Sequence, residues 1–317
     1  MNAVFACLTG AKKIELMEKE IAPAENQVLV RMIACGICNG DVQIFRQDRN
    51  APKPFGHEPV GEVLDVGPGV NYFKPGDRVV GCIGGSFATA FITDATKLFK
   101  VSPELGNLAA LAESLKCVTT VSRAAAPDFG DCVAVVGAGF MGLGSVSMLA
   151  DAWCRTLVAV DPEVSRRAAA LKFGADEALD PTADDFNEQV DRVTRGRGMD
   201  AAIEFAGSPR AVTTAAMMLR RRGRLVLGGG NTVGSDCSKQ IYMKAITVHH
   251  APPMFSPDEP DDWHRCIRAM EDGRYPLEDM VSHTFKLSEI QQAMECADQG
   301  AKNGYLKGIV RNDISGE

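Results

Sequence analysis

Two short segments near the N-terminus carry side chains of the kinds that bind metal ions. The first runs Gly36-Ile37-Cys38-Asn39-Gly40-Asp41, and the second runs Gly56-His57-Glu58-Pro59. Together they supply a thiolate, an imidazole and carboxylates, which are ligand types that Zn²⁺ takes in proteins. Such a set predicts a metal ion able to polarise the oxygen of an alcohol or a carbonyl group.

The same residues also have interpretations without a catalytic metal. Cys35 and Cys38 form a C-x-x-C motif, which is typical of a redox pair or of half a structural zinc site. No second C-x-x-C occurs in the chain. His57 alone could be a hydrogen-bonded core histidine, although the flanking Gly56 and Glu58 favour a ligand. From these residues alone, both a metal ligand and a redox cysteine remain open for Cys38.

A third segment indicates what a metal would be used for. The apolar run Val133–Val136 leads directly into Gly137-Ala138-Gly139-Phe140-Met141-Gly142. A strand that enters G-x-G-x-x-G and then a helix is typical of a dinucleotide-binding turn. In that turn Gly137 permits the tight bend, Gly139 lets the pyrophosphate approach, and Gly142 lets helix and strand pack closely. A metal together with a dinucleotide suggests hydride transfer.

The end of the next predicted strand bears on which dinucleotide binds. Asp161 is placed there to accept hydrogen bonds from the ribose hydroxyl groups of the adenosine. Its charge would repel a 2′-phosphate, so we expect NAD rather than NADP as the cofactor. Arg166 and Arg167 are counter-evidence because either could pair with a phosphate, although their positions also fit the solvated face of a helix.

The spacing of apolar residues predicts the elements that position these groups. Short apolar runs broken by glycine and proline, at 27–34, 60–66, 77–82 and 87–92, predict an all-β, barrel-like unit. Helical spacing then runs from 107 to 126, and strands alternate with helices beyond it, as in β-α-β units on a parallel sheet. We expect strands at 132–136, 156–160, 201–205, 224–227 and 305–310, and helices at 141–150, 163–173, 185–195, 210–221, 261–271 and 288–298. The arginines at 220–222 would then lie at a helix C-terminus.

Composition excludes several classes of function. The 317 residues, 45% hydrophobic and 24% charged, are enough to bury a core, and this length predicts two domains. A formal net charge of -7 argues against nucleic-acid partners, which need a basic surface. The uncharged run 132–150 contains glycines that fit a strand, turn and helix better than a membrane span. Ten cysteines without a signal-like N-terminal segment indicate reduced thiols, so we expect a cytoplasmic protein with no membrane partner.

Taken together, these motifs resemble one family of enzymes. The matching segments occur in order along nearly the whole chain: Gly36-Ile37-Cys38-x-x-Asp41, Gly56-His57-Glu58, Gly76-Asp77-x-Val79, Leu111-Ala112-Glu113, Gly137-Ala138-Gly139-x-x-Gly142 and Lys307. They resemble the medium-chain, zinc-dependent alcohol dehydrogenases, and most closely the polyol and threonine dehydrogenase branch. The resemblance implies an α/β protein with a GroES-like β-barrel catalytic domain at 1–115, to which 251–317 return. Residues 116–250 would form a Rossmann domain, a doubly wound parallel sheet that binds NAD.

The resemblance also implies roles for particular residues. Cys38, His57 and Glu113 would bind a catalytic zinc ion, and Glu58 would sit behind the metal and exchange onto it. Asp41 would hold the His57 ring by its other nitrogen. The cofactor side would comprise Gly137, Gly139, Phe140, Met141, Gly142, Asp161, Arg166, Ala206, Gly229 and Lys307.

The resemblance further implies one catalytic zinc ion and no structural one. Many relatives carry a four-cysteine lobe after the Gly-Asp-x-Val strand, whereas this chain has only Cys82 there. The missing lobe would leave one side of the protein open. The oligomeric states common in the family, together with this open side, favour a homodimer or a homotetramer. The expected partner is a small-molecule substrate.

Two departures from the family pattern leave the substrate open. Gly40 replaces the serine or threonine that passes the substrate proton outward, and Gln43 replaces a histidine often found at the end of that relay. We therefore assign Gly40 and Gln43 to the substrate side, with Phe45, Arg46 and the segment 251–253 as further pocket candidates. Core packing or a contact with another subunit would explain Gln43, Phe45, Arg46 and 251–253 equally well.

Three functional hypotheses follow. The leading one is hydride transfer between NAD and a secondary alcohol or ketone of a polyol, cyclitol, sugar or amino alcohol. The second is reduction of a conjugated C=C bond or an iminium by NAD(P)H, in which the lost relay at Gly40 would matter less. The third is a nucleotide-binding protein without turnover, and the intact metal ligands count against it.

Overall fold

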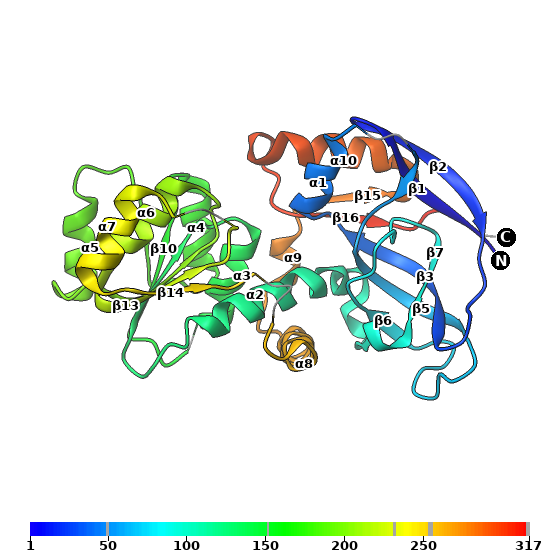
Figure 1. The fold of residues 1–317 in the computed structure, drawn as a ribbon, viewed down its shortest axis with the longest axis horizontal. Helices are drawn as coiled ribbons and strands as arrows, with labels where there is room; N and C mark the ends of the chain where they lie inside the picture. The colour runs from blue at the N-terminus through cyan, green and yellow to red at the C-terminus, as the bar shows by residue number, and fades with distance from the viewer. Residues whose placement is uncertain (49–50, 151, 231–232, 253–255, 315–317) are drawn as a thin grey trace. The chain divides into compact units, whose positions relative to one another are not determined.

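The computed structural model describes residues 1–48, 51–150, 152–230, 233–252 and 256–314 (Figure 1). Two compact units divide the chain. Residues 1–114, 270–272 and 277–317 form the first, and residues 115–269 and 273–276 form the second. The second unit therefore includes residues 251–269, which the sequence analysis assigned to the first domain.

The first unit contains two β-sheets. The smaller has the order β2-β1-β4, formed by β1 (Asn2–Gly10), β2 (Lys13–Glu20) and β4 (Lys53–Pro54). The larger has the order β15-β16-β3-β5-β6-β8, and β7 also pairs with β3. Its strands are β3 (Gln27–Gly36), β5 (Glu58–Val66), β6 (Arg78–Val80), β7 (Ala90–Asp94), β8 (Phe99–Lys100), β15 (His283–Lys286) and β16 (Gly308–Arg311).

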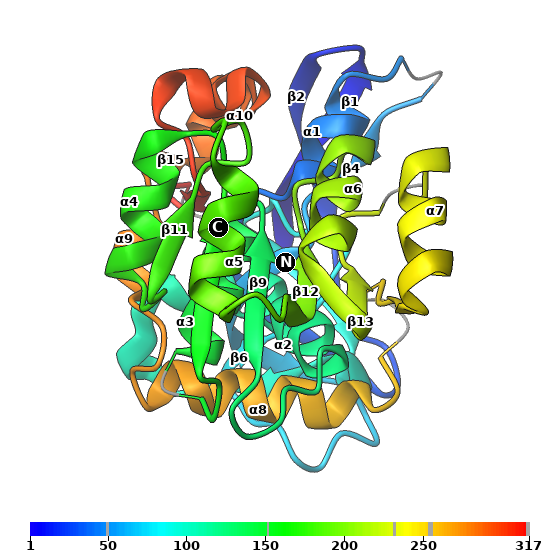
Figure 2. The same cartoon turned by 90° about the vertical axis from the view of Figure 1, so that its left-hand side faces the viewer.

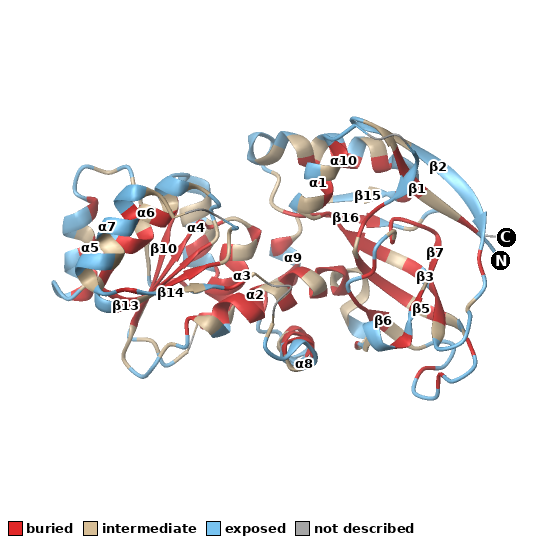
Figure 3. Cartoon of the chain, in the orientation of Figure 1, coloured by how far each residue is buried: buried red, intermediate tan, exposed pale blue. Residues whose placement is uncertain are grey.

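Helices pack against these strands around one hydrophobic core. They are α1 (Asn39–Phe45), α9 (Leu277–Met280) and α10 (Ile290–Gln299), with 3₁₀ turns η1 (Ala95–Lys97), η2 (Pro103–Leu111), η4 (Leu287–Glu289) and η5 (Gly300–Asn303). The core includes Met32, Phe45, Phe87 and Met294, all buried. Figure 3 shows buried residues, in red, along much of β3 and β5. Burying an apolar side chain of this size contributes about 1.5–3 kcal/mol relative to leaving it exposed. This core fixes α1, and with it the residues at the start of that helix.

The second unit is built on a six-stranded parallel sheet (Figure 2). Its order is β11-β10-β9-β12-β13-β14, which is the order of a doubly wound dinucleotide-binding sheet. The strands are β9 (Cys132–Val136), β10 (Thr156–Val160), β11 (Glu177–Leu179), β12 (Met199–Glu204), β13 (Leu219–Leu227) and β14 (Thr247–His250). The α/β fold class predicted from the sequence is confirmed.

In the described residues, seven helices lie wholly or mostly in this unit. They are α2 (Ala112–Ala124), α3 (Phe140–Leu149), α4 (Val164–Lys172), α5 (Phe186–Thr194), α6 (Pro209–Met218), α7 (Ser235–Lys244) and α8 (Glu259–Glu271). One hydrophobic cluster joins α5, α6 and α7 to one face of the sheet. Figure 1 shows α2 and α3 on the opposite face, where Ser122 and Ser145 share a hydrogen bond of 2.8 Å. No helix in the described ranges is long and apolar enough to span a membrane.

The predicted helix at 210–221 was wrong at its C-terminal end. Helix α6 ends at Met218, and β13 begins at Leu219, which is buried and pairs with Met199. The arginines at 220–222 therefore lie on a strand. The last carbonyls of α6 accept hydrogen bonds from Lys244 instead, whose Nζ lies 2.6 Å from the oxygen of Met217. A cation at that end of a helix is favourable because the helix C-terminus carries partial negative charge.

Candidate active site

Strand register brings distant residues together at one edge of the larger sheet. Gly36, the last residue of β3, pairs with Glu58 on β5 and with Ile309 on β16. Cys38 therefore follows β3 at the place where β5 begins and where Lys307 precedes β16. Gly36 must be glycine here, because a Cβ would lie 2.0 Å from Oε2 of Glu58. The absent side chain leaves room for the carboxylate.

Helix α1 holds Cys38 and Asp41 in a fixed relation. Cys38 is the N-cap residue, and its Sγ accepts a hydrogen bond from the backbone N–H of Gly40 at 3.4 Å. Oδ2 of Asp41 accepts one from the backbone N–H of Cys38 at 3.0 Å. This reciprocal arrangement is a capping box, which satisfies N–H groups that a helix start would leave unpaired. A seven-residue helix thus positions a sulfur ligand and a carboxylate together.

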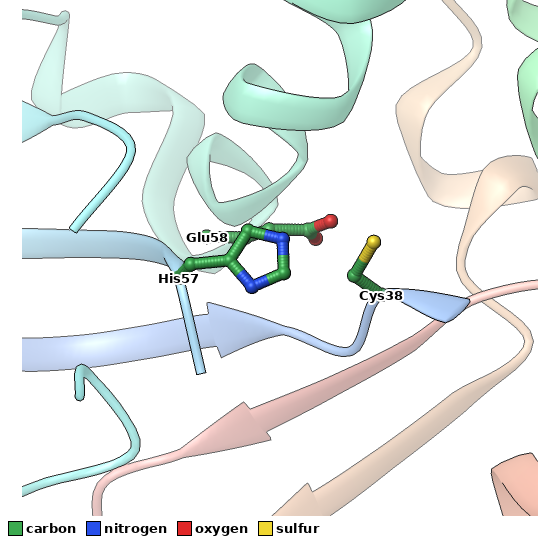
Figure 4. Close-up of side chains that lie close together, drawn as sticks. All are labelled: Cys38, His57 and Glu58. Atoms are coloured by element: carbon green, nitrogen blue, oxygen red, sulfur yellow. The ribbon is translucent and has the colours of Figure 1, made fainter. Parts of the chain in front are cut away.

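The structure brings Cys38, His57 and Glu58 into one group. Their ligand atoms all lie within 4.8 Å of one another, and Figure 4 shows the three side chains converging. Donors bound to a tetrahedral Zn²⁺ at its usual bond lengths lie about 3.5 Å apart. A thiolate, an imidazole and a carboxylate at this spacing fit a zinc ion. Among the described residues, this is the group of such side chains that could hold a metal.

Asp41 orients the imidazole of this group. Its Oδ1 lies 3.2 Å from Nδ1 of His57, and the carboxylate is 1% exposed. A carboxylate that accepts from Nδ1 leaves Nε2 available as the ligand. Burial opposes the charged imidazole, but hydrogen bonds to Asp41 and Cys38 and the charges of Asp41 and Glu58 outweigh it, so the pKa of His57 is raised. In the metal-free protein a proton therefore competes for the nitrogen that a metal would take.

Glu58 lies in a fully buried hydrogen-bond network. Its Oε2 accepts from Nζ of Lys307 at 2.5 Å, and its Oε1 accepts from the hydroxyl of Ser114 at 2.7 Å. Burial alone would raise the pKa of Glu58, but the charges of Lys307 and His57 lower it. Lys307 responds in the opposite sense: burial would lower its pKa, and the charge of Glu58 raises it. Glu58 and Lys307 therefore form a buried pair of opposite charges.

Cys35 does not resemble a metal ligand or a reactive thiol. It is fully buried, its Sγ lies 3.4 Å from Oγ of Ser86, and it forms no disulfide. Burial raises the pKa of Cys35 to about 12. A thiol that stays protonated is a poor nucleophile and a poor ligand. The redox interpretation of the C-x-x-C motif has no support in this geometry.

The other predicted site residues of the first unit lie in varied surroundings. Glu113 is half-buried in the first turn of α2 and is not a member of the three-residue group. Gly40 is in α1 beside the group, since a Cβ there would lie 3.7 Å from Sγ of Cys38. Gln43 is exposed.

Two of the pocket candidates have structural roles. Phe45 belongs to the hydrophobic core, and Nε of Arg46 pairs with Asp298 at 2.5 Å. Core packing thus accounts for Phe45, which the apolar period of α1 turns inward, and Arg46 pairs with a carboxylate on α10. A pocket role for these two residues stays a prediction. In the segment 251–253, Ala251 and Pro252 lie in the second unit, and Pro253 falls outside the described residues.

The dinucleotide turn of the second unit is shaped by its glycines. Gly137 has φ +96°, and a Cβ on it would lie 2.6 Å from the backbone nitrogen of Ala206. A Cβ on Gly142 would lie 1.8 Å from the carbonyl oxygen of Gly137. Gly139, by contrast, precedes α3 with open space around it. Phe140 and Met141 begin α3, whose N-terminal N–H groups and positive dipole end suit a phosphate.

A cavity of about 230 Å³ lies beside this turn. It is lined by the predicted residues Gly137, Asp161, Arg166 and Ala206, together with residues that sequence reasoning missed, including Thr182, Ser208 and Arg210. The missed signal was Ser208-Pro209, a helix start a few residues after the end of β12, which puts the next residues near the carboxyl edge of the sheet.

Asp161 is held rigidly at the wall of that cavity. Its Oδ2 accepts a hydrogen bond from the backbone N–H of Ala138, and its Oδ1 accepts one from that of Glu163, both at 2.9 Å. Arg166 lies 3.6 Å from Oδ2. Gly229 follows β13, where a Cβ would lie 2.8 Å from the backbone nitrogen of Gly207. Lys307 belongs to the first unit, where its Nζ donates to Glu58, and its contact with the cofactor stays a prediction.

Two family models match successive parts of the chain. The model described as alcohol dehydrogenase GroES-like domain matches residues 24–103, and the model described as zinc-binding dehydrogenase matches residues 141–271. L-threonine 3-dehydrogenase from Pyrococcus abyssi (strain GE5 / Orsay) is 28% identical over 90% of this chain and 92% of that protein. L-threonine 3-dehydrogenase from Caldanaerobacter subterraneus subsp. tengcongensis is 27% identical, again over 90% and 92%.

Solved structures share the fold along nearly the whole chain. 2R,3R-butanediol dehydrogenase from Bacillus subtilis has a TM-score of 0.85 at 24% identity, covering 98% of this chain and 99% of that one. An alcohol dehydrogenase from Escherichia coli CFT073, complexed with NADH, has a TM-score of 0.87 at 20% identity, with the same coverage. A candidate zinc-binding dehydrogenase from Sinorhizobium meliloti 1021, bound to NADP, has a TM-score of 0.83 at 22% identity, with the same coverage. At these identities the likeness establishes the fold alone.

The GroES-like and the zinc-binding dehydrogenase models match in one chain, and the curated relatives that align with nine tenths of it are dehydrogenases. The chain therefore belongs to the zinc-dependent medium-chain alcohol dehydrogenases, a family of oxidoreductases.

Proposed function

We propose that this chain uses one catalytic zinc ion and NAD to interconvert a secondary alcohol and a ketone on a polyol, cyclitol, sugar or amino alcohol. The observation that carries the proposal is the convergence of Cys38, His57 and Glu58, with Asp41 behind the histidine. Relatives named L-threonine 3-dehydrogenase support the substrate class, because the hydroxyl group at C3 of threonine is a secondary alcohol.

The metal would be held by Cys38, His57 and Glu113 on α2, with Glu58 next to it and able to exchange onto it. When bound, zinc acts as a Lewis acid that polarises the substrate oxygen. Asp41 keeps the His57 ring oriented by accepting from Nδ1. Lys307 and Ser114 keep the carboxylate of Glu58 charged and in place within a buried site.

The cofactor would bind at the turn between β9 and α3. Its pyrophosphate would receive N–H groups at the start of α3, and its adenosine would occupy the cavity lined by Asp161 and Ala206. Asp161 supports NAD because its charge, at the cavity wall, disfavours a 2′-phosphate. Arg166 and Arg210 line the same cavity and oppose this preference. Comparing turnover with NAD and NADP, for the native protein and Asp161→Asn, tests it: the variant should gain relative activity with NADP.

The proton path differs from that of a relay through a side-chain hydroxyl. Gly40 provides no such group, so the substrate proton would leave through water or through a second polar group of the substrate. This residue also supports a second candidate function, the reduction of a conjugated C=C bond or an iminium by NAD(P)H. Turnover of an alkene or iminium panel in the absence of any alcohol oxidation would favour that alternative.

We also propose that the chain works in the cytoplasm as a homodimer or homotetramer. The ten cysteines form no disulfide in the structure and would stay reduced there. Strand β14 is at the edge of the six-stranded sheet, and such an edge carries backbone groups able to pair with another strand. Light scattering at several protein concentrations would measure the oligomeric state.

Metal analysis with two cysteine variants tests the main proposal. The purified protein should contain about one zinc ion per chain and oxidise secondary alcohols with NAD. Cys38→Ala should lose the metal and the activity, whereas Cys35→Ala removes a neighbouring buried thiol and should keep both. A native protein with far less than one zinc ion, or a Cys38→Ala variant with full turnover, would show that the proposed mechanism is wrong.

A further inference from the structure

Ser114, Glu58 and Lys307 form a closed ring of hydrogen bonds in the first unit. Nζ of Lys307 donates to Oε2 of Glu58 at 2.5 Å and to Oγ of Ser114 at 2.8 Å, and Ser114 donates in turn to Oε1 of Glu58 at 2.7 Å. All three residues are buried: Glu58 is 1% exposed, and Ser114 and Lys307 are each 4% exposed. Ser114 thus both accepts and donates, which fixes the orientation of its hydroxyl group.

The ring engages both oxygens of the only carboxylate in the metal-binding group. Oε1 is held by Ser114 and Oε2 by Lys307, while the ligand atom of Glu58 lies within 4.8 Å of those of Cys38 and His57. If Glu58 turned toward a metal, it would give up at least one of these hydrogen bonds inside the protein. A buried donor that loses its acceptor is costly, and more so when it is charged. The ring therefore opposes coordination by Glu58.

The hold on Oε1 depends on the residue type at position 114. Ser114 follows Glu113 in the sequence, and a proline in its place would offer neither a hydroxyl nor an N–H group. A proline there would leave Oε1 without this donor. The hydrogen bond to Oε1 of Glu58 thus depends on the side chain that this chain has at position 114, the hydroxyl of Ser114.

We propose that Ser114 is a positioning residue that keeps Glu58 off the catalytic metal, an inference that rests on the proposed function. With both oxygens held, Glu58 acts as a charge behind the ion, and a coordination position stays open for substrate. Without the serine hydroxyl, Oε1 loses its partner and the metal becomes the best replacement. The serine thereby controls how readily the carboxylate exchanges onto the metal.

Metal exchange and the spectrum of a cobalt-substituted protein test this role. The set comprises the native protein, Ser114→Ala, Ser114→Cys as a second loss of the hydroxyl at similar volume, and Ser114→Thr, which retains it. Ser147→Ala is the matched control, because Ser147 is a buried serine of α3 whose Oγ has no hydrogen-bond partner. Three quantities are measured: release of Co²⁺ to a chelator, its visible ligand-field bands, and kcat against KM.

The alanine and cysteine variants should release Co²⁺ about tenfold more slowly, in line with the usual effect of groups behind metal ligands. Their ligand-field bands should weaken as a carboxylate joins the ion, and kcat should fall with the KM for NAD unchanged. Ser114→Thr and Ser147→Ala should match the native protein.

Release from Ser114→Ala and Ser114→Cys at the native rate or faster, with native spectra, would overturn the positioning role while leaving the proposed function standing. A native protein that binds neither Zn²⁺ nor Co²⁺ would instead overturn the proposed function, and this inference with it. The two failures are distinguished by the native protein alone.

Discussion

The metal-binding group and the dinucleotide turn achieve precise geometry by opposite means. In the first unit, Cys38, His57 and Glu58 are positioned by charged and hydrogen-bonding side chains such as Asp41 and Lys307. In the second unit, the turn after β9 is shaped by side chains that are missing. A Cβ on Gly137 or Gly142 would lie 2.6 Å or 1.8 Å from a backbone atom.

Because of this difference, substitutions in the two sites should impair different properties of the protein. A site made of side chains can lose a partner and keep its backbone, so its losses should appear in metal affinity and in pH dependence. A site made of backbone cannot accept an extra atom without moving, so its losses should appear in stability and in cofactor affinity together. The predictions below separate these two patterns.

The largest effect is expected from Gly142→Ala. The added methyl group would lie 1.8 Å from the carbonyl oxygen of Gly137, which is backbone and cannot turn aside. Overpacking of this kind costs about 1–3 kcal/mol, and the displaced turn should weaken NAD binding as well, because the N–H groups that face the pyrophosphate would move with it. Thermal unfolding and fluorescence titration with NADH would measure both quantities, with metal content unchanged.

Gly139→Ala is the matched control for this change. Its backbone φ is -76°, and a Cβ would meet nothing within 4 Å, so the fold should remain as stable as in the native protein. The methyl group would still obstruct a pyrophosphate, so NADH affinity should fall alone. Equal losses of stability in the two alanine variants would contradict the argument from backbone geometry.

The second largest effect is expected from Asp41→Asn. The change removes the charge that faces Nδ1 of His57 and keeps the size of the side chain. Partners behind a metal-binding histidine typically contribute about 10–100-fold in metal affinity. Zinc affinity should fall within that range, whereas NADH affinity stays native. Asp77→Asn, which removes a carboxylate paired with Lys100 on the surface of the same unit, should change neither affinity.

A third prediction concerns pH, because protons and metal compete at His57. The pKa of this residue is raised above its ordinary 6.5, so the metal-free protein carries a proton there that metal binding must release. Zinc affinity should therefore rise by about tenfold per pH unit from His57 alone between about pH 6 and 8. NADH affinity should show no such slope, since backbone N–H groups do not titrate. Titrations at several pH values would reveal a flat zinc profile if this is wrong.

The raised pKa of His57 has the opposite effect on the metal-free protein: its stability should fall as pH rises, whereas zinc affinity increases. A group whose pKa is higher in the folded state than in the unfolded state stabilises the protein. This contribution is fully present below the pKa of the unfolded state and is lost as pH rises through the pKa of the folded state. The metal-free protein should therefore lose this contribution at alkaline pH, while the metal-bound protein gains from tighter binding. Chemical unfolding with and without zinc across that range would separate the two trends.

The sequence predicted both sites because their key residues sit in short, regular patterns. Strands 132–136 and 156–160 match β9 and β10, and the glycine motif falls between β9 and α3 as its spacing requires. Cys38 and His57 were recognisable because each lies in a short segment beside the end of a strand.

What could not be predicted depends on contacts between distant parts of the chain. The pairing of Gly36 with both Glu58 and Ile309, which brings Lys307 to the metal-binding group, is a matter of strand register. Nothing near Lys307 in the sequence reveals that partner. The end of α6 was misplaced for a similar reason, since the burial of Leu219 against the sheet outweighs the helical pattern that continues into the arginines.

The smallest effect, and the one that bears most on chemistry, is expected from Gly40→Ser. Space exists for the side chain, since a Cβ would lie 3.7 Å from Sγ of Cys38 and 4.0 Å from Cε1 of His57. Stability should stay within about 0.5 kcal/mol of the native value. A hydroxyl restored beside the metal-binding group should raise kcat for alcohol oxidation about twofold to tenfold, well below the 10²–10⁴ of a positioned acid or base.

Gly40→Ala supplies the control, because it fills the same space without a hydroxyl group and should leave kcat at or below the native value. A rise in the serine variant alone would assign the effect to proton transfer and would place the native bottleneck in the proton path. Equal rates in all three proteins would mean that water or the substrate already carries the proton. An increase confined to reduction of a C=C bond or an iminium would favour the second candidate function. If alcohol oxidation is faster in the serine variant alone, the side-chain site differs from the backbone site in a further respect: an added hydroxyl group can improve it.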